Sequence, residues 1–336
     1  MSATTPAATT PISSLRKLIQ RRVSWLPVGA AVLILILMFA AGQSYFGRFL
    51  TPRLLSSLLV DNAYLIVLAA GMTFVILTGG IDLSVGAVMA FTGMLAAKLL
   101  STGVPTGVVI PLMIASGAVF GLIIGVLVNY FDVQPFIASL AGMFLARGLC
   151  FVVSLEAIQV KDTTVLGLQS IKLGDFVTWY ITPTGIIALL VIVVAAWVLG
   201  YTRFGRTVYA IGGNEQSARL MGLPVARTKV LVYVISGVCA GIAGLLFTAY
   251  TAAGYSLNGI GTELDTIASV VIGGTLLAGG SGYVIGSLVG VLVYGVIKVS
   301  ITFLGADSSW TRITIGILLL VFVVVQRVLV ARGSRR

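Results

Sequence analysis

The residues that could do chemistry in this sequence are a few polar side chains set between or within apolar stretches. Asp82 and Ser84 lie in the run TGGIDLSVG, which separates two apolar segments. A carboxylate at or near membrane depth is costly, so by default it indicates a functional role. The structural alternative, which we favour, is a helix–helix turn in which these two side chains cap the helix that follows.

A second group of polar residues follows the apolar run that ends near residue 250. Tyr255 and Asn258 precede two acids, Glu263 and Asp265. This combination could contact a polar solute. It could equally provide local helix caps, since Thr262 and Asp265 stand where caps are needed.

Isolated polar residues also interrupt the apolar runs: Asp61, Asn62, Gln134 and Arg147. An arginine inside a membrane helix should face protein or water, and a nearby carboxylate would be a plausible structural partner for Arg147. Amides and tyrosines suit a neutral polyol, because they donate and accept hydrogen bonds without imposing a charge. The candidate pathway residues are Asn62, Asp82, Ser84, Gln134, Tyr255, Asn258, Glu263 and Asp265.

Several chemistries are absent from the sequence. The chain has no histidine, so histidine-based metal sites and histidine-based catalysis are excluded, and no catalytic or metal-binding residue is expected. No G-x-x-x-x-G-K-[ST] motif is present to hold a nucleotide phosphate. Cys150 and Cys239 both lie in apolar runs and are expected to be buried small residues.

The composition places these residues in a polytopic helical membrane protein. Of 336 residues, 58% are hydrophobic and 9% are charged, whereas soluble domains have about 25% charged residues. The net charge of +11 does not indicate nucleic-acid binding, because the cations gather at the ends of apolar spans.

The apolar runs predict about ten membrane spans. Their approximate ranges are 26–45, 55–78, 83–100, 106–129, 135–154, 181–200, 230–250, 266–279, 283–304 and 311–328. With both termini in the cytoplasm, more than half of the 21 Lys and Arg residues fall inside, as the positive-inside rule requires. About eight spans with two re-entrant segments would satisfy that rule equally.

We divide the chain accordingly. Residues 1–22 form a disordered, basic cytoplasmic N-terminus, 23–330 a single transmembrane domain, and 331–336 a cytoplasmic tail. The external segment 155–179 is expected to lie on the membrane surface. Glycines break the chain at 273–274 and 279–282, which indicates either a transport pathway or tight packing. For Gly282, Gly286 and Gly290, four residues apart, packing is favoured.

The loop 201–229 is the longest polar interruption in the C-terminal two-thirds of the chain and is expected in the cytoplasm. It predicts a short helix over 214–222. Asn214 is a good N-cap, and Glu215 in the first turn suits the helix dipole. Gly222 favours a left-handed end, and Pro224 prevents the helix from resuming.

Four stretches in the same order resemble the membrane permeases of bacterial ABC importers for ribose, xylose, arabinose and galactose. They are GGIDLSVG at 79–86, PFIASLAGMFLARG at 135–148, RFGRTVYAIGGNEQSARLMG at 203–222 and ELDTIASVVIGGTLLAGGSG at 263–282. Within that group, the segments 61–86, 253–277 and 308–319 are most similar to a permease subunit of the galactofuranose importer.

The resemblance implies an all-α fold of the type II ABC importer kind. It implies a second permease subunit, forming a heterodimer, ABC ATPase subunits that hold ATP and Mg, and a periplasmic sugar-binding protein. The chain itself would bind no cofactor and catalyse no reaction. The coupling helix that contacts the ATPase would consist of Asn214, Glu215, Gln216, Ser217, Ala218, Arg219, Leu220, Met221 and Gly222.

Two further expectations complete the prediction. Arg48 and Arg53, if external, would attract acidic patches on the binding protein. An ATP-independent carrier or channel for a polar solute is the alternative function, although a carrier does not require the capped helix. An intramembrane enzyme is disfavoured, because no H-E-x-x-H or G-x-S-x-G motif is present.

Overall fold

A computed structural model describes residues 11–47, 49–175, 179–307 and 309–333, with side chains from residue 27 to residue 324. The fold is almost entirely helical, as predicted. Its helices are α1 (Pro11–Phe46), α2 (Pro52–Asp61), α3 (Ala63–Leu77), α4 (Val85–Ser101), α5 (Thr106–Tyr130), α6 (Pro135–Val153), α7 (Thr163–Ser170), α8 (Pro183–Tyr201), α9 (Arg203–Gly213), α10 (Glu215–Leu220), α11 (Val225–Thr251), α12 (Thr262–Ile272), α13 (Val284–Phe303) and α14 (Ser309–Gly333).

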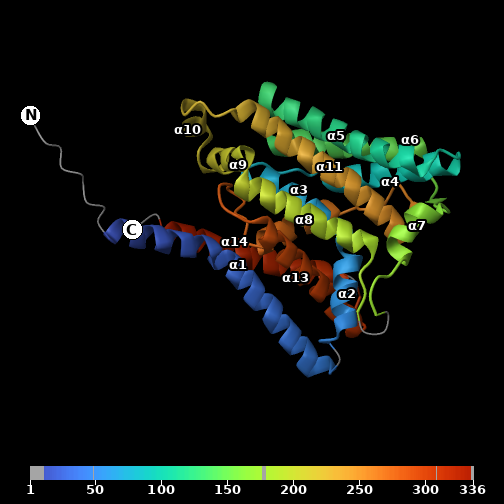
Figure 1. Cartoon of the computed structure of the whole chain (residues 1–336), viewed down its shortest axis with the longest axis horizontal. Helices are drawn as coiled ribbons and strands as arrows, with labels where there is room; N and C mark the ends of the chain where they lie inside the picture. Colours follow the sequence, from blue (N-terminus) through green and yellow to red (C-terminus); the bar gives the residue numbers. More distant parts are fainter. Residues whose placement is uncertain (1–10, 48, 176–178, 308, 334–336) are drawn as a thin grey trace, which may run out of the picture.

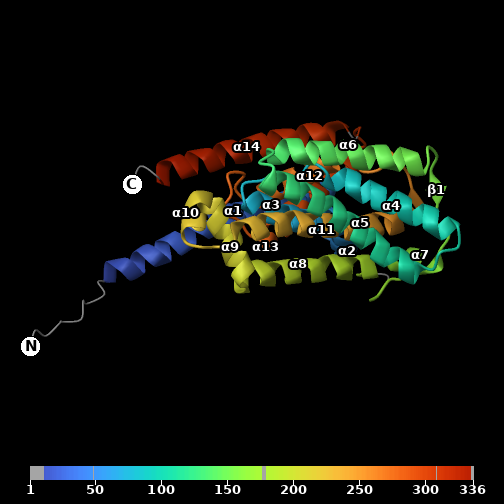
Figure 2. The same cartoon turned by 90° about the horizontal axis from the view of Figure 1, so that it is seen from above.

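The helices lie in rows around a central pair. Figure 2 shows α6 and α14 along one side and α8 along the other, with α3 and α11 between them. Every residue of α3 except Tyr64 is buried, so α3 is the centre of the core. An all-apolar helix of this kind is expected where neighbours surround it on every side.

Local sequence explains where several of these helices begin. Thr51, Thr182 and Thr202 accept hydrogen bonds from backbone N–H groups of the first turns of α2, α8 and α9. Proline occupies the first helical position of α2, α6 and α8, where its fixed φ is favourable and its missing N–H costs nothing.

Glycine allows α5 and α11 to pack with their backbones in contact. A Cβ atom added at Gly117 would meet the backbone of Gly237, and one added at Gly121 would meet the backbone of Tyr233. Gly241 lies equally close to the backbone of Met113. Small residues at such spacing are the usual basis of close helix packing in membranes.

Six helices in the described part of the chain are long and apolar enough to cross a membrane, namely α1 from Pro27, α5, α6, α8, α11 and α13. The predicted span 55–78 is instead a bent pair, α2 and α3, at an angle of 57°. The predicted spans 83–100 and 311–328 correspond to shorter apolar helices. The predicted span 266–279 is helical only as far as Ile272, where α12 ends, and a glycine-rich loop forms the rest.

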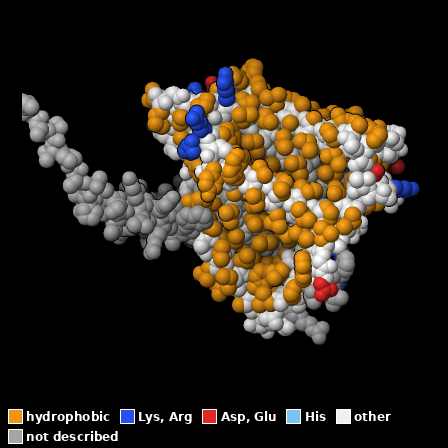
Figure 3. Space-filling model, in the orientation of Figure 1, with side chains coloured by type: hydrophobic (Ala, Val, Ile, Leu, Met, Phe, Trp, Pro, Cys, Tyr) orange, Lys and Arg blue, Asp and Glu red, His pale blue; other side chains and the backbone are white. Residues whose placement is uncertain are grey.

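The two ends of the molecule differ from its middle. The start of α1 and the end of α14 lie at the same end as α9 and α10, while α7 is at the other end (Figure 1). Figure 3 shows an apolar surface between two ends that carry the charged side chains. Such a belt is what a helical protein presents to a bilayer.

Two differences from the sequence prediction concern local structure. Helix α1 begins at Pro11, inside the N-terminal segment expected to be disordered. In the segment 155–179, β1 (Ile158–Gln159) pairs antiparallel with β2 (Ala253–Gly254) and ties this segment to the end of α11. Both cysteines are buried, as expected, and both are free.

Candidate functional site

The helix predicted over 214–222 is α10, and its ends are built as expected. The side chain of Asn214 accepts a hydrogen bond from the backbone N–H of Ser217 at 2.8 Å. Gly222 has a φ of +73°, and the N–H of Leu223 bonds the carbonyl of Ala218 at 3.1 Å, which closes the helix. A six-residue helix is short, so these end contacts define it.

Glu215 joins α10 to α11. Its carboxylate forms ion pairs with Arg219 at 2.7 Å and with Lys229 at 3.0 Å. Partial burial alone would raise the pKa of Glu215, but the hydrogen bonds from Arg219 and Lys229 outweigh it and lower that pKa below its ordinary value. The carboxylate is therefore charged at neutral pH and holds α10 against the start of α11.

The sequence analysis did not identify α9, the helix that precedes α10. A Cβ atom at Gly212 of α9 would meet the carbonyl of Leu77 and the N–H of Gly280. Tyr209 donates a hydrogen bond to the carbonyl of Gly282 at 2.8 Å. The glycine break at 279–282 is therefore the surface against which α9 packs. Gly279, Gly280 and Gly282 take positive φ angles.

The tip of α10 is apolar and exposed. The side chains of Leu220 and Met221 are 84% and 67% exposed. The flanking cations Arg203, Arg206, Arg219 and Arg227 belong to the same polar end. An apolar tip in a charged loop is typical of a surface that another protein covers.

Asp82 and Ser84 are buried and serve a structural role. Asp82 accepts hydrogen bonds from the backbone N–H and hydroxyl of Ser84, at 2.9 and 2.6 Å, and from the hydroxyl of Ser236 at 2.7 Å. Asp82 is 1% exposed, so it cannot contact a solute in this conformation. The predicted capping role is wrong, because Ser84 is the N-cap residue of α4 but makes no side-chain cap, and Asp82 instead holds the turn before α4 and links it to Ser236 on α11.

The second polar group lies on a loop that runs back along α4. Gly254 lies against Gly93 and Ala97, whereas Gly259 lies against Gly86 near the start of α4. Non-helical backbone at membrane depth requires protein or water beside it. Arg147 supplies part of the protein environment that this loop backbone needs, because its guanidinium donates hydrogen bonds to the carbonyls of Ser256 and Asn258, both at 2.7 Å.

Two expectations for this loop were wrong. Arg147 bonds backbone carbonyls rather than a carboxylate, since a guanidinium can donate several hydrogen bonds to one loop. Neither Thr262 nor Asp265 caps α12, because its N-cap is Gly261, at a φ of +85°. Asp265 instead accepts a hydrogen bond from Tyr294 at 3.0 Å, and Glu263 accepts one from the N–H of Gly261 at 3.2 Å.

The remaining candidate residues are scattered. Tyr255 is 37% exposed, and Asn258 is half-buried on the same loop. Gln134 is exposed at the N-cap of α6. Arg53 is exposed on α2, whereas Arg48 falls outside the described residues.

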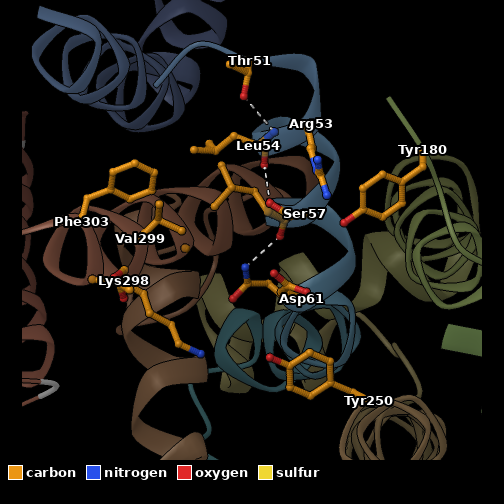
Figure 4. A pocket seen from close by; sticks show the side chains of 14 residues that line it. Thr51, Arg53, Leu54, Ser57, Asp61, Tyr180, Tyr250, Lys298, Val299 and Phe303 are labelled. Atoms are coloured by element: carbon orange, nitrogen blue, oxygen red, sulfur yellow. Dashed lines mark hydrogen bonds between the residues drawn. The ribbon is translucent and has the colours of Figure 1, made fainter. Parts of the chain in front are cut away.

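One cavity collects polar groups from several elements. It lies between α2, α11 and α13 and includes Asp61, Asn62, Tyr250 and Lys298 in its lining (Figure 4). Of these, only Asn62 was a candidate from sequence. Lys298 carried a recognisable signal, a cation within an apolar run, but Tyr250 did not. Within the described part of the chain, no group of three or more Cys, Asp or Glu side chains could hold a metal ion.

Comparison with known proteins places the chain in a family. Residues 54–323 match the family described as branched-chain amino acid transport system / permease component. The fructose import permease protein FruG of Bifidobacterium longum is 45% identical over 318 residues, covering 92% of this chain and 93% of its own. No solved structure gives a significant match.

Two relatives from Escherichia coli K12 agree. The inner membrane ABC transporter permease protein YjfF is 43% identical over 313 residues, covering 93% of this chain and 95% of its own. The ribose import permease protein RbsC is 35% identical over 309 residues, covering 90% of this chain and 94% of its own. The chain is therefore a membrane permease of the branched-chain amino acid transport system permease family, in the group that includes the sugar permeases of ABC importers.

Proposed function

We propose that this chain forms the membrane pathway of an ATP-driven importer that takes up a neutral monosaccharide delivered by a periplasmic binding protein. Galactofuranose is the first candidate, followed by similar hexoses and pentoses. A second permease subunit completes the pathway, with a sister chain as the expected partner. ATP and Mg bind to separate ATPase subunits.

The exposed tip of α10 is the observation that carries the coupling part of this proposal. Leu220 and Met221 are adjacent, largely exposed apolar side chains, so a partner that covered them would gain by burying apolar surface. The caps at Asn214 and Gly222 and the ion pairs of Glu215 hold that tip in a fixed position. A rigid apolar tip on a cytoplasmic loop suits a socket on an ATPase.

The arrangement of the termini supports the orientation. The start of α1, the end of α14 and α10 share one end of the molecule. That end carries most of the basic residues, which favours the cytoplasm. Six long helices and the bent α2–α3 pair account for seven crossings. Helix α4, helix α12 with its loop, and helix α14 would add three, so the chain would cross the membrane about ten times.

The mechanism follows from these contacts. ATP binding would close the ATPase dimer and displace α10. Glu215 passes that displacement to α11, and α9 passes it to the glycine loop 279–282 and the end of α3. These elements would then shift between outward-open and inward-open arrangements.

The test replaces the tip and measures uptake. Leu220→Asp combined with Met221→Asp should leave the fold intact, because both side chains are largely exposed. Uptake of labelled sugar by cells that carry the complete importer should fall roughly tenfold or more, as expected when an apolar anchor of an interface is lost. Purification of the permease should recover less ATPase.

Leu155→Asp is the matched control, since Leu155 is 74% exposed on the external segment. It should leave uptake and ATPase recovery unchanged. Wild-type uptake by the tip variant would remove α10 from the coupling contact. Uptake that persists in cells without any ATPase partner would favour a carrier or channel.

A further inference from the structure

The cavity between α2, α11 and α13 has the size of a ligand site. Its volume is about 460 Å³, within the range of roughly 300–1,000 Å³ that is typical of small-molecule pockets. Leu54, Leu58, Val299 and Phe303 form an apolar wall. The polar side chains of Asp61, Tyr250 and Lys298 lie around one space in the lower half of Figure 4.

Asn62 gives the cavity an unsatisfied buried acceptor. The residue is 3% exposed and lines the cavity. Its side-chain N–H₂ donates to the carbonyl of Leu58 at 2.8 Å, but its side-chain oxygen has no partner among the described residues. A buried amide oxygen without a partner is costly, so a ligand that donates a hydrogen bond would be stabilised there.

The helix break between α2 and α3 explains how this group reaches the cavity. The two helices meet at Asp61 and Asn62 with a bend of 57°. The bend turns these polar side chains away from the continuous apolar face of α3. Breaks of this kind in membrane helices are the usual place for a solute site.

Two opposite charges and several phenols complete the lining. Lys298 lies close enough to Asp61 for the charges to attract, yet neither side chain makes a hydrogen bond or ion pair with another described residue. Tyr250 and Tyr180 add hydroxyl groups and aromatic rings. Arg53 is exposed at the rim.

We propose that this cavity is a monosaccharide-binding site on the permease itself, in which Asp61, Asn62, Tyr250 and Lys298 contact the hydroxyl groups of a neutral sugar. The proposal rests on the sugar-import function proposed above. Asp61 and Lys298 offset each other, and Arg53 at the rim leaves the lining with one net positive charge. Sugar hydroxyls donate to Asp61 and to the oxygen of Asn62, and they accept from Lys298.

The test measures protection of a single cysteine in the cavity wall. Ser57 lines the cavity, and the two native cysteines are buried, so a membrane-impermeant maleimide should label Ser57→Cys with little background. Ribose, fructose, allose or galactofuranose, each at up to roughly 100 mM, should slow that labelling.

Thr163→Cys on the exposed surface of α7 is the matched control, and no sugar should protect it. In the Ser57→Cys background, Asp61→Asn or Lys298→Met should raise the half-protecting sugar concentration roughly tenfold, as expected for loss of one hydrogen bond to a charged group. Unchanged labelling of Thr163→Cys in the same backgrounds verifies that these variants are folded and inserted.

Each other outcome overturns a distinct statement. A complete importer that takes up sugar while no sugar protects Ser57→Cys overturns the cavity assignment alone. Labelling that sugars leave unchanged but that phospholipid slows after delipidation assigns the cavity to a lipid headgroup and also overturns it. Sugar protection in a chain whose complete importer takes up no sugar supports the cavity and overturns the import function.

Discussion

Glu215 is the residue on which the position of α10 depends. It is the shared partner of Arg219 on its own helix and of Lys229 on α11. Its side chain is 34% exposed, so solvent screens both pairs and their contribution to stability is small. The two ion pairs matter because they hold α10 in position, since this short helix has few other contacts.

The lowered pKa of Glu215 gives a pH dependence with a definite sign. A carboxylate whose pKa is depressed by folding adds stability above its unfolded pKa, near 4.5, and loses it as the pH falls through the folded value. Hydrogen-exchange protection of α10, corrected for the intrinsic rate, should stay constant from pH 7 to about 5 and decline below that.

Glu215→Gln should lower the protection of α10 at neutral pH by about 0.5 kcal/mol and remove the acid-dependent decline. Glu156→Gln, at an exposed external glutamate, should change neither property. A wild-type profile in the Glu215→Gln protein would mean that the ion pairs do not hold α10.

At the scale of elements, α9 and the glycine loop 279–282 pack backbone against backbone. The N–H of Gly280 donates to the carbonyl of Leu77 at 2.9 Å, and Gly212 covers that hydrogen bond from the other side. Three segments far apart in the chain therefore meet where only glycine fits.

Two neighbouring glycines test this contact. Gly212→Ala should destabilise the protein by about 1–3 kcal/mol, because its methyl group would meet backbone atoms that cannot move independently. Gly213→Ala should be neutral or slightly stabilising, since a Cβ atom there has nothing within 4 Å. Thermal unfolding in detergent measures both, and equal stability of the two variants would contradict the packing.

Elements with local signals were predictable, and those that depend on distant contacts were not. The ends of α10 followed from Asn214 and Gly222, because caps act within a few residues. The close packing of Gly212 depends on Leu77 and Gly280, which are distant in sequence, so no local pattern predicts the contact. The partner of Arg147 is likewise more than a hundred residues away in sequence.

In the candidate site, too, residues with a local sequence signal were predictable and residues placed by distant contacts were not. Asn62 was recognisable as an amide within an apolar run, but its side chain lines a cavity because α2 and α3 bend there. Tyr250 ends an ordinary apolar helix, so only the fold shows its role. Asp82 looked similar to Asn62 in sequence, yet Ser84 and Ser236 enclose it.

At the scale of the whole molecule, the apolar belt lies between two charged ends, and the proposed orientation places the end with α10 in the cytoplasm (Figure 3). Membrane-impermeant maleimide should label Thr163→Cys in intact cells, because α7 lies at the end opposite α10, which the proposed orientation places outside (Figure 1). Ser217→Cys on α10 should react only after the membrane is permeabilised. The opposite pattern would reverse the assigned topology.

The backbone contact between α5 and α11 has a mechanical consequence. The backbones of α5 and α11 touch at Gly117 and Gly237 with no side chains between them. The two helices should therefore move together as one rigid unit. Helix α11 has 27 residues, about 40 Å of length, with Lys229 near its start and Tyr250 near its end. A small tilt applied to α11 near Lys229 should therefore displace the cavity wall near Tyr250.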